Sequence, residues 1–402
     1  MRLLKFVTLF AVGGTERQFV NLAVSLDRSK VDVRFGCLRK WGQLVETVED
    51  QGIAIDDYGV TSFRSPRAVR AQLRLARDIR RNRIDVVHSY NFYANVFAIP
   101  AAKLAGARVV ASIRDMGAYL SPMQKRMQRF ACRFADHILV NAEAIREWLV
   151  SDGYDAERIT VIPNGIDMTR FRSREEWTSI REELGVAEDT PLAGYVGRIE
   201  RRKGLEDLLA AAAIIVRDNA AVRFVIAGVA NDANYMTAIE DLASSLGIRD
   251  RVLFIGYRDD VPRVLSQLSV SVLPSLSEGL SNTLLESMAA GAPMVATRVG
   301  GSAEAMRDGE NGLLIEPSDP QSLAGAIKTL LHDSALASRL GSAARQTIVD
   351  RFSMSRMVER TTHLYEHLAG LRSSVVGRGG LDAQGSSCAN APMTDDPRPT
   401  TV

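Results

Sequence analysis

Two glutamates eight positions apart, Glu278 and Glu286, stand in the string SEGLSNTLLESMAAGAPMVAT, directly after the apolar run VSVLPS. We expect Glu278 in a loop that follows a buried strand and Glu286 about two turns into the next helix. Gly279 permits close backbone approach, and Ser281 or Asn282 suits the N-cap. The free N–H groups of the helix start suit a phosphate, and the glutamates suit sugar hydroxyls. The alternative, a capped surface helix with one exposed glutamate, fits this punctuated string less well.

A pair of basic residues forms the second candidate site. Arg198 and Lys203 lie in GYVGRIERRKGLEDLL, between a buried strand and a helix. A planar guanidinium and a compact ammonium could clamp a diphosphate between them. The alternative is a solvated basic turn, which fits Arg201 and Arg202.

A glycine pair, Gly13 and Gly14, follows the first strand in VGGTERQFVNLA. Such a turn into a helix offers backbone N–H groups to a phosphate or a sugar. The chain has no G-x-G-x-x-G string, so a dinucleotide site is not predicted. It also has no D-x-D triplet, so we expect no metal ion and no other cofactor.

The elements that position these residues are strand-length apolar runs that alternate with helix-length segments. Continuous rather than alternating apolar runs predict parallel strands covered by helices on both faces. The expected strands are 3–10, 31–38, 53–60, 84–90, 107–113, 137–142, 159–165, 191–199, 222–229, 252–257, 270–275 and 293–299. The sequence therefore predicts an α/β fold of two doubly wound Rossmann-like domains that face each other across a ligand-binding cleft.

The expected domains are residues 1–165 and 166–351, and residues 373–402, with little apolar content, are expected to be a disordered tail. A length of 402 residues with 46% hydrophobic and 24% charged residues suits two globular domains. The net charge of +2 does not favour a nucleic-acid partner.

The compartment is predicted from cysteines and apolar runs. Three cysteines without short spacings give neither a disulfide framework nor a zinc pattern and suit a reducing compartment. No run reaches the ~18–20 apolar residues of a membrane span. The start, MRLLKFVTLFAVGG, fits a buried strand better than a signal peptide, so we expect a cytoplasmic location.

The motifs, in this order and separated by VIPNGID, resemble the family 4 glycosyltransferases, retaining enzymes of the GT-B fold, over about residues 3–370. The resemblance implies transfer of a sugar from a nucleoside diphosphate sugar to an acceptor in glycan, polysaccharide or glycolipid biosynthesis. It implies that the last helix, 352–370, packs back on the N-terminal domain, which is the acceptor side. The C-terminal domain is then the donor-binding side, and the leaving phosphate assists attack on the same face.

The resemblance also assigns roles. Glu278 would contact the transferred sugar, Glu286 the ribose, and Arg198 with Lys203 the diphosphate. The expected catalytic residues are Glu278, Arg198, Lys203 and Arg114. The expected donor-binding residues are Gly14, Gly279, Leu280, Ser281, Asn282, Thr283 and Glu286. Gly13 and His88 are candidate acceptor or sugar contacts.

One position departs from the family pattern. Where many members carry a sugar-contacting histidine, this chain reads VVASIRDM and offers Arg114. Arg114 can donate a hydrogen bond to a hydroxyl but cannot act as a base. It either replaces that histidine or packs nearby. His88, at the end of the preceding strand, is either a ligand or a hydrogen-bonded structural residue.

Basic residues cluster in the first half, with eight arginines and one acid between Thr61 and Arg83. Five of them share one stripe of a predicted helix: Arg67, Arg70, Arg74, Arg77 and Arg81. The stripe suits an anionic or lipid-linked acceptor, peripheral contact with an anionic membrane, or plain solvation. In the stretch 123–134 we expect the apolar stripe, Met123, Met127, Phe130 and Phe134, in the core, and its basic face at the rim of the acceptor cleft.

Other functions share the expected fold. A sugar-nucleotide epimerase would need no second substrate, and a phosphorylase would need inorganic phosphate. A non-catalytic scaffold of a polysaccharide assembly complex would be expected to have lost Glu278 or Lys203, and both are present.

Overall fold

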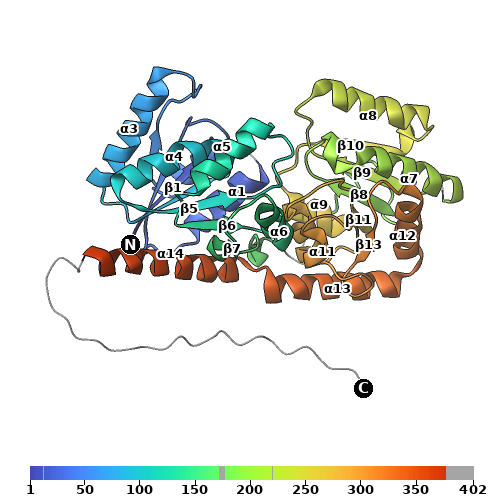
Figure 1. Cartoon of the computed structure of the whole chain (residues 1–402). Coiled ribbons are helices and arrows are strands. Elements are labelled where there is room, and N and C mark those ends of the chain that lie inside the picture. Colours follow the sequence, from blue (N-terminus) through green and yellow to red (C-terminus); the bar gives the residue numbers. More distant parts are fainter. Residues whose placement is uncertain (12, 172–176, 220, 377–402) are drawn as a thin grey trace.

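The computed structural model of the chain describes residues 1–11, 13–171, 177–219 and 221–376, and of residues 371–376 only the backbone. It contains two parallel sheets, each with helices on both faces, that form two halves side by side (Figure 1). The predicted pair of doubly wound domains is therefore confirmed.

The first sheet has seven strands in the order β3-β2-β1-β4-β5-β6-β7. Their bounds are β1 Arg2–Val7, β2 Asp32–Cys37, β3 Ile55–Asp57, β4 Val86–Tyr90, β5 Arg108–Ile113, β6 His137–Val140 and β7 Ile159–Val161. β1 is buried between β2 and β4, as expected for the apolar start of the chain.

The second sheet has six strands in the order β10-β9-β8-β11-β12-β13. Their bounds are β8 Leu192–Val196, β9 Arg223–Ala227, β10 Val252–Gly256, β11 Val270–Leu273, β12 Met294–Thr297 and β13 Leu313–Ile315. The prediction missed β13, because its three residues are too short for a clear apolar run beside Gly312 and Pro317.

Helices cover the two faces of the first sheet. One face carries α1 (Gly14–Val24), α2 (Leu44–Glu49) and α14 (Met354–Val376). The other carries α3 (Pro66–Arg81), α4 (Asn91–Ala105), α5 (Pro122–Cys132) and α6 (Glu143–Ser151). Within that layer α4 contacts both α3 and α5.

Seven helices belong to the described part of the second half. They are α7 (Leu205–Asp218), α8 (Ala233–Ser245), α9 (Val261–Gln267), α10 (Asn282–Ala289), α11 (Ser302–Ala305), α12 (Pro320–His332) and α13 (Ser334–Arg351). Short 3-10 turns lie at Ala156–Arg158, Met168–Arg170, Arg201–Lys203 and Arg249–Arg251. No helix among the described residues is both long enough and apolar enough to cross a membrane.

The chain returns to the first half through α14, which runs along the bottom of Figure 1 and contacts α1, β4 and β5. The helix continues to Val376, so the prediction of a disordered tail from residue 373 is wrong for residues 373–376. After Gly370 the sequence has no glycine or proline before Gly377, so nothing local ends the helix earlier. Residues 377–402 lie outside the described part.

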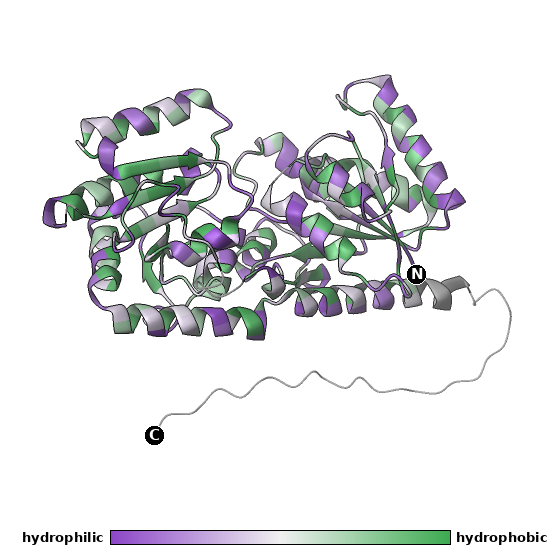
Figure 2. Cartoon of the chain, turned by 180° about the vertical axis from the view of Figure 1, so that it is seen from behind, coloured by the Kyte–Doolittle hydropathy of each residue, from purple (hydrophilic) through white to green (hydrophobic). Residues whose placement is uncertain are grey.

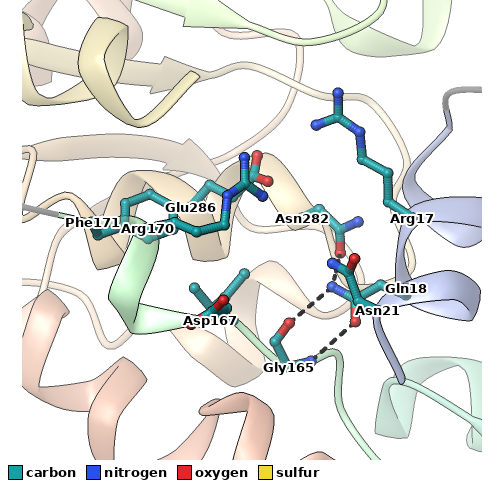
Figure 3. A pocket seen from close by; sticks show the side chains of 10 residues that line it. Arg17, Gln18, Asn21, Gly165, Asp167, Arg170, Phe171, Asn282 and Glu286 are labelled. Atoms are coloured by element: carbon teal, nitrogen blue, oxygen red, sulfur yellow. Dashed lines mark hydrogen bonds between the residues drawn. The ribbon is translucent and has the colours of Figure 1, made fainter. Parts of the chain in front are cut away.

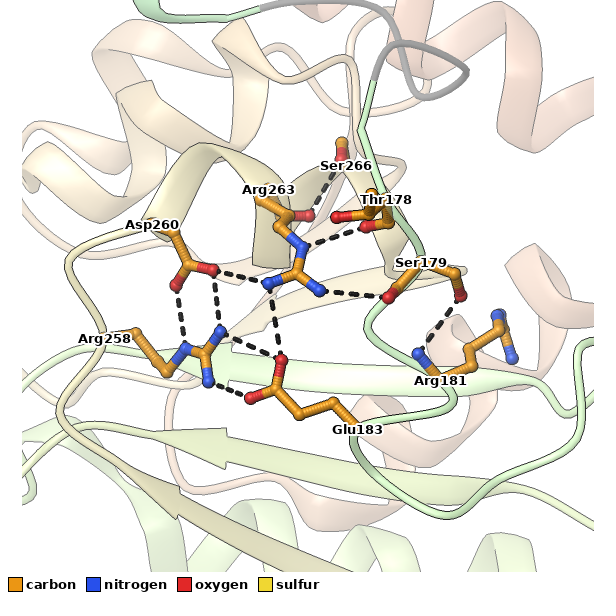
Figure 4. A network of polar contacts seen from close by, with 8 residues as sticks. All are labelled: Thr178, Ser179, Arg181, Glu183, Arg258, Asp260, Arg263 and Ser266. Atoms are coloured by element: carbon orange, nitrogen blue, oxygen red, sulfur yellow. Dashed lines mark hydrogen bonds and ion pairs between the residues drawn. The ribbon is translucent and has the colours of Figure 1, made fainter.

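An ion network fixes the segment that leads into β8 (Figure 4). Glu183 accepts from the guanidinium groups of Arg258 and Arg263, and Asp260 pairs with both arginines. Arg263 also donates to the backbone oxygens of Thr178 and Ser179, at 2.9 and 3.0 Å. The polar stretch between the sheets is therefore held to α9 where it is described.

The prediction that the apolar stripe of residues 123–134 belongs to the core is wrong. Met123, Met127, Phe130 and Phe134 are all exposed, and Gln128, Ala131 and Cys132 form the buried face of α5. The face of α5 that is turned inward is therefore the one with Gln128, Ala131 and Cys132, and α5 contacts α4. In the rear view of Figure 2, apolar and polar residues mix along the outer helices of both halves.

Candidate functional site

The start of α10 lies at the junction of the two halves. Ser281 is its N-cap, and its hydroxyl oxygen accepts from the backbone N–H of Leu284 at 3.4 Å. Asn282 is the first helical residue, and its Nδ2 donates to the backbone oxygen of Gly14 at 2.9 Å. The predicted helix start and the predicted glycine turn are therefore brought together, although they are 268 residues apart.

A side chain that the sequence interpretation missed completes this junction. Gln18 donates to the Gly165 oxygen at 3.0 Å and to Asn282 Oδ1 at 3.4 Å (Figure 3). Asn164 donates to the same Oδ1 at 2.7 Å and to the backbone oxygen of Leu280 at 3.2 Å. A glutamine one turn after Gly14, on the buried face of a helix, was the available signal.

A pocket opens beside this junction (Figure 3). It is lined by Arg17, Gln18, Asn21, Gly165, Ile166, Asp167, Arg170, Phe171, Asn282 and Glu286. Burial raises the pKa of the Glu286 carboxyl, and the charges of Arg17 and Arg170 act in the opposite direction. The carboxylate is therefore poorly hydrated and suited to accept hydrogen bonds from a ligand.

Glu278 and Lys203 form a buried pair. Glu278 is 7% exposed, and its Oε1 accepts from Lys203 Nζ and from the Ser275 hydroxyl, the latter at 2.7 Å. The turn that carries Lys203 ends at Gly204, where a Cβ would lie 2.0 Å from the Pro274 oxygen at a φ of +66°. Only glycine fits there, so the two motifs of the second half are locked together.

Arg198 stands apart from this pair, half-exposed, with its Nη2 at 3.6 Å from Glu200 Oε1. It follows Gly197, where a Cβ would lie 3.6 Å from Thr283 Oγ1, so the end of β8 borders the start of α10. The predicted diphosphate clamp therefore consists of one open guanidinium and one ammonium that Glu278 already binds.

The first glycine turn carries an acid. A Cβ on Gly13 would lie 2.3 Å from Glu16 Oε2, so this carboxylate covers the start of α1. Burial raises the pKa of Glu16, an effect that Arg198 opposes and Asp115 increases. Burial likewise raises the pKa of Asp115, which Arg202 and Arg198 oppose. Two acids of the first half thus face arginines of the second.

Gly279 is another point of close approach between the halves. A Cβ there would lie 2.8 Å from the backbone oxygen of Arg114 and 2.9 Å from Ile145 Cδ1. Glu304 of α11 makes a second bridge, because its carboxylate accepts from the N–H groups of Glu143 and Ala144, at 2.8 and 2.9 Å. Glu304 thus caps α6 across the junction, a contact that no sequence motif predicts.

Arg114 and His88 are not among the residues that line the pocket. His88 bonds Tyr365 of α14 through Nδ1 and Ser112 through Nε2, the latter at 2.9 Å. Burial lowers its pKa well below the usual value, so the ring is neutral. Of its two predicted roles, this geometry supports the structural one.

Arg114 is buried over the ring of Tyr90, at 5.5 Å from the ring centroid. Its Nε and Nη1 have no hydrogen-bond partner among the described residues. Nearby, the buried Lys5 of β1 donates to the Tyr90 hydroxyl at 3.1 Å, and burial lowers the pKa of this lysine. Arg114 therefore packs against Tyr90 with two guanidinium nitrogens unpaired among the described residues, and its contact with the sugar stays a prediction.

The described residues hold no group of three or more His, Cys, Asp or Glu side chains placed to bind a metal ion.

Comparison with known proteins covers both halves. The family model described as Glycosyltransferase Family 4 matches residues 12–170, and that described as Glycosyl transferases group 1 matches residues 177–347. The D-inositol 3-phosphate glycosyltransferase of Nocardia farcinica is 34% identical over 217 residues, 52% of this chain and 48% of that protein. The chain spans about half the length of the first curated relatives it matches.

Two further likenesses are longer. The N-acetyl-alpha-D-glucosaminyl L-malate synthase of Bacillus anthracis is 25% identical over 78% of this chain and 82% of its own length. The crystal structure of HepE from Anabaena in complex with UDP has a TM-score of 0.83 at 23% identity, and covers 91% of this chain and 100% of its own. The similarity to the HepE structure confirms the GT-B fold.

Proposed function

Because the chain belongs to family 4 of the glycosyltransferases, we propose that it transfers a sugar from a nucleoside diphosphate sugar to an acceptor, with retention of anomeric configuration. The alternatives are a sugar-nucleotide epimerase, a phosphorylase and a non-catalytic scaffold.

One observation carries the proposal: α10 begins where both halves meet, between the Glu286 pocket and the Lys203–Glu278 pair. A helix start and two cations suit a diphosphate, and a poorly hydrated carboxylate suits ribose hydroxyls. We assign donor binding to residues 166–351 and the acceptor side to residues 1–165. Uridine is the proposed base, since the related HepE structures hold UDP, one of them as UDP-glucose.

The chemistry follows from these positions. The bond between the anomeric carbon and the donor phosphate oxygen breaks, and a bond from the acceptor hydroxyl forms on the same face. The acceptor proton passes to the departing phosphate, so atoms and charge balance without a protein nucleophile. Arg198, Lys203 and the N–H groups at Asn282 and Thr283 stabilise the charge that develops on the leaving group. We propose that this requires no metal ion.

The acceptor is proposed to be anionic or lipid-linked, made in glycan, polysaccharide or glycolipid biosynthesis. Support comes from α3, whose arginine stripe is exposed along its length. Within the stripe, Arg74 forms an ion pair with Asp78 at 3.6 Å. The proposed location is the cytoplasm, with peripheral contact at an anionic membrane.

A thermal-shift screen against UDP-, GDP- and ADP-sugars tests the proposal. A donor at ~100 times its dissociation constant should stabilise the protein by ~2.7 kcal/mol. Proton NMR of the product should show the anomeric configuration of the donor. Conversion of a sugar nucleotide without any acceptor would favour the epimerase, and dependence on inorganic phosphate the phosphorylase. No stabilisation by any sugar nucleotide would overturn the assignment and favour the scaffold.

A further inference from the structure

An apolar stripe on the outside of α5 has no part in the proposed sugar transfer. Met123 and Phe130 are 71% and 61% exposed, and Met127 and Phe134 are exposed beside them. The spacing of 4, 3 and 4 residues puts all four on one side of the helix. Phe130 and Phe134 meet edge to face at 5.4 Å, in contact with each other rather than with the core.

Basic residues border this stripe without any acid. Lys125, Arg126, Arg129 and Arg133 lie among the four apolar side chains, and residues 116–135 contain no Asp or Glu. Lys125 packs its ammonium over the Trp148 ring at 5.6 Å, and Arg129 donates to the Asp152 backbone oxygen. These two cations are therefore held at the edge of the stripe.

We propose that α5 is a docking helix for an anionic lipid surface, with the Met/Phe stripe in the acyl boundary and the basic residues at the phosphates. An apolar face on a helix whose own charged residues are all cations has the chemistry of an interfacial helix. A second copy of the chain fits worse, because a symmetric contact would bring the same cations together.

α3, on the other side of α4, adds basic residues to the same side of the first half. α3 and α5 both pack on α4, so the arginine stripe of α3 belongs to the same outer layer of the first half (Figure 1). The stretch from Thr61 to Arg83 adds a net charge of +7, from eight arginines and Asp78. The α3 arginines thus attract the surface, and α5 inserts into it.

This docking also orients the cleft, an argument that rests on the proposed function. The loop between β5 and α5 carries Arg114 and Asp115, and the backbone of Arg114 touches Gly279 across the junction. A lipid surface at α5 therefore lies beside the acceptor side of the site, where a lipid-linked acceptor would present its polar head.

Sedimentation with phosphatidylcholine vesicles, with and without phosphatidylglycerol, tests the docking. The wild type should bind only the anionic vesicles, and Met123→Gln/Phe130→Gln should weaken binding about tenfold. Glutamine retains helix propensity, which circular dichroism checks. The matched control is Leu246→Gln/Val349→Gln, two exposed apolar side chains of the second half, which should bind as the wild type does.

Several results would overturn the docking helix. They are absence of binding by the wild type, equal binding to phosphatidylcholine alone, or undiminished binding by Met123→Gln/Phe130→Gln. A wild-type dimer that this variant converts to a monomer would assign the stripe to a second copy instead. Hydrolysis of a soluble donor, measured without vesicles, should be unchanged in the variant. Vesicle binding by a protein that transfers no sugar would contradict only the proposed function.

Discussion

β1 and β8 occupy corresponding places in their sheets, each the third strand of its order, and each leads into a glycine turn and a helix. The charges at these two places differ. After β1, the first turn of α1 bears Glu16, whose carboxylate covers the helix start, and Arg17 beside it. The turn after β8 has an excess of cations, with Arg198, Lys203 and two further arginines against Glu200.

Under the proposed function, this difference separates the two substrates. A diphosphate is attracted to the cations of the second half and repelled by Glu16 and Asp115 of the first. Carboxylates with raised pKa values are instead suited to an acceptor hydroxyl, from which they accept a hydrogen bond. Under the proposed function, one βα turn serves the donor, and its counterpart lies on the side from which the acceptor arrives.

Removing the ammonium of the second turn should have the largest effect. Lys203→Ala should lower the rate of sugar transfer about 10²-fold, because the leaving diphosphate loses a preorganised cation. It also leaves the buried Glu278 carboxylate with the Ser275 hydroxyl as its remaining hydrogen-bond partner among the described residues, so the melting temperature should fall as well. Steady-state kinetics and thermal denaturation measure the two effects.

Arg201→Ala is the matched control for this change. Arg201 lies in the same 3-10 turn but is exposed over the Tyr235 ring, at 4.9 Å from its centroid. Its removal should change transfer less than twofold. Equal losses of transfer rate in both variants would mean that the whole basic turn, rather than Lys203 alone, stabilises the leaving diphosphate.

The two glutamates should separate turnover from binding. Glu278→Ala should mainly lower kcat, because the proposed function assigns this carboxylate to the sugar that is transferred. Glu286→Ala should mainly raise the KM of the donor, about tenfold or ~1.4 kcal/mol, because it lines the pocket beside Asn282. If both variants kept kcat and KM within about twofold, the site assignment would be wrong.

Glu16→Gln tests the acidic turn, with an effect of a few-fold. It should tighten UDP binding, since a charge that faces Arg198 and repels phosphate is removed. Burial raises the pKa of Glu16 above its usual 4.5, so its charge lowers the stability of the folded protein at neutral pH. Near pH 7 the variant should therefore have a higher melting temperature than the wild type. Below pH 4.5 the two melting temperatures should be equal. A lower melting temperature near pH 7 would show that the carboxylate stabilises the turn.

The arginine stripe should give the smallest effect on chemistry. Replacing Arg67, Arg70, Arg74 and Arg77 with Gln should weaken sedimentation with anionic vesicles, most clearly at ~0.1 M salt, where the Debye length is ~10 Å. Hydrolysis of a soluble donor should not change. Vesicle binding equal to that of the wild type would leave α3 as a solvated basic helix.

Strands, helices and motifs could be predicted from the sequence where residues close together in the chain determine them. Glu278 and Lys203 could be identified because the turns that carry them require glycines and helix caps, which are visible in the sequence. Gly204 is an example, since its backbone conformation leaves no room for a Cβ. The role of Gln18 could not be predicted, since its partners Gly165 and Asn282 come from distant segments.

Which side chains are buried was predicted less well than where the strands and helices lie. The apolar stripe of α5 has the spacing of a core face, yet the buried residues of α5 are Gln128, Ala131 and Cys132 instead. Periodicity shows that a helix has two faces but does not show which of them meets the sheet. The placement of Arg114 depended in the same way on Tyr90, a residue of another strand.

The central claim is that a nucleoside diphosphate binds where α10 meets the first half, held by Lys203 and Glu286. Titration calorimetry of UDP against the wild type, Lys203→Ala, Glu286→Ala and the exposed control Glu310→Ala tests it most directly. The wild type and the control should bind with the same Kd, and the other two variants should bind at least about tenfold more weakly. One Kd for all four proteins, or no heat of binding to the wild type, would contradict it.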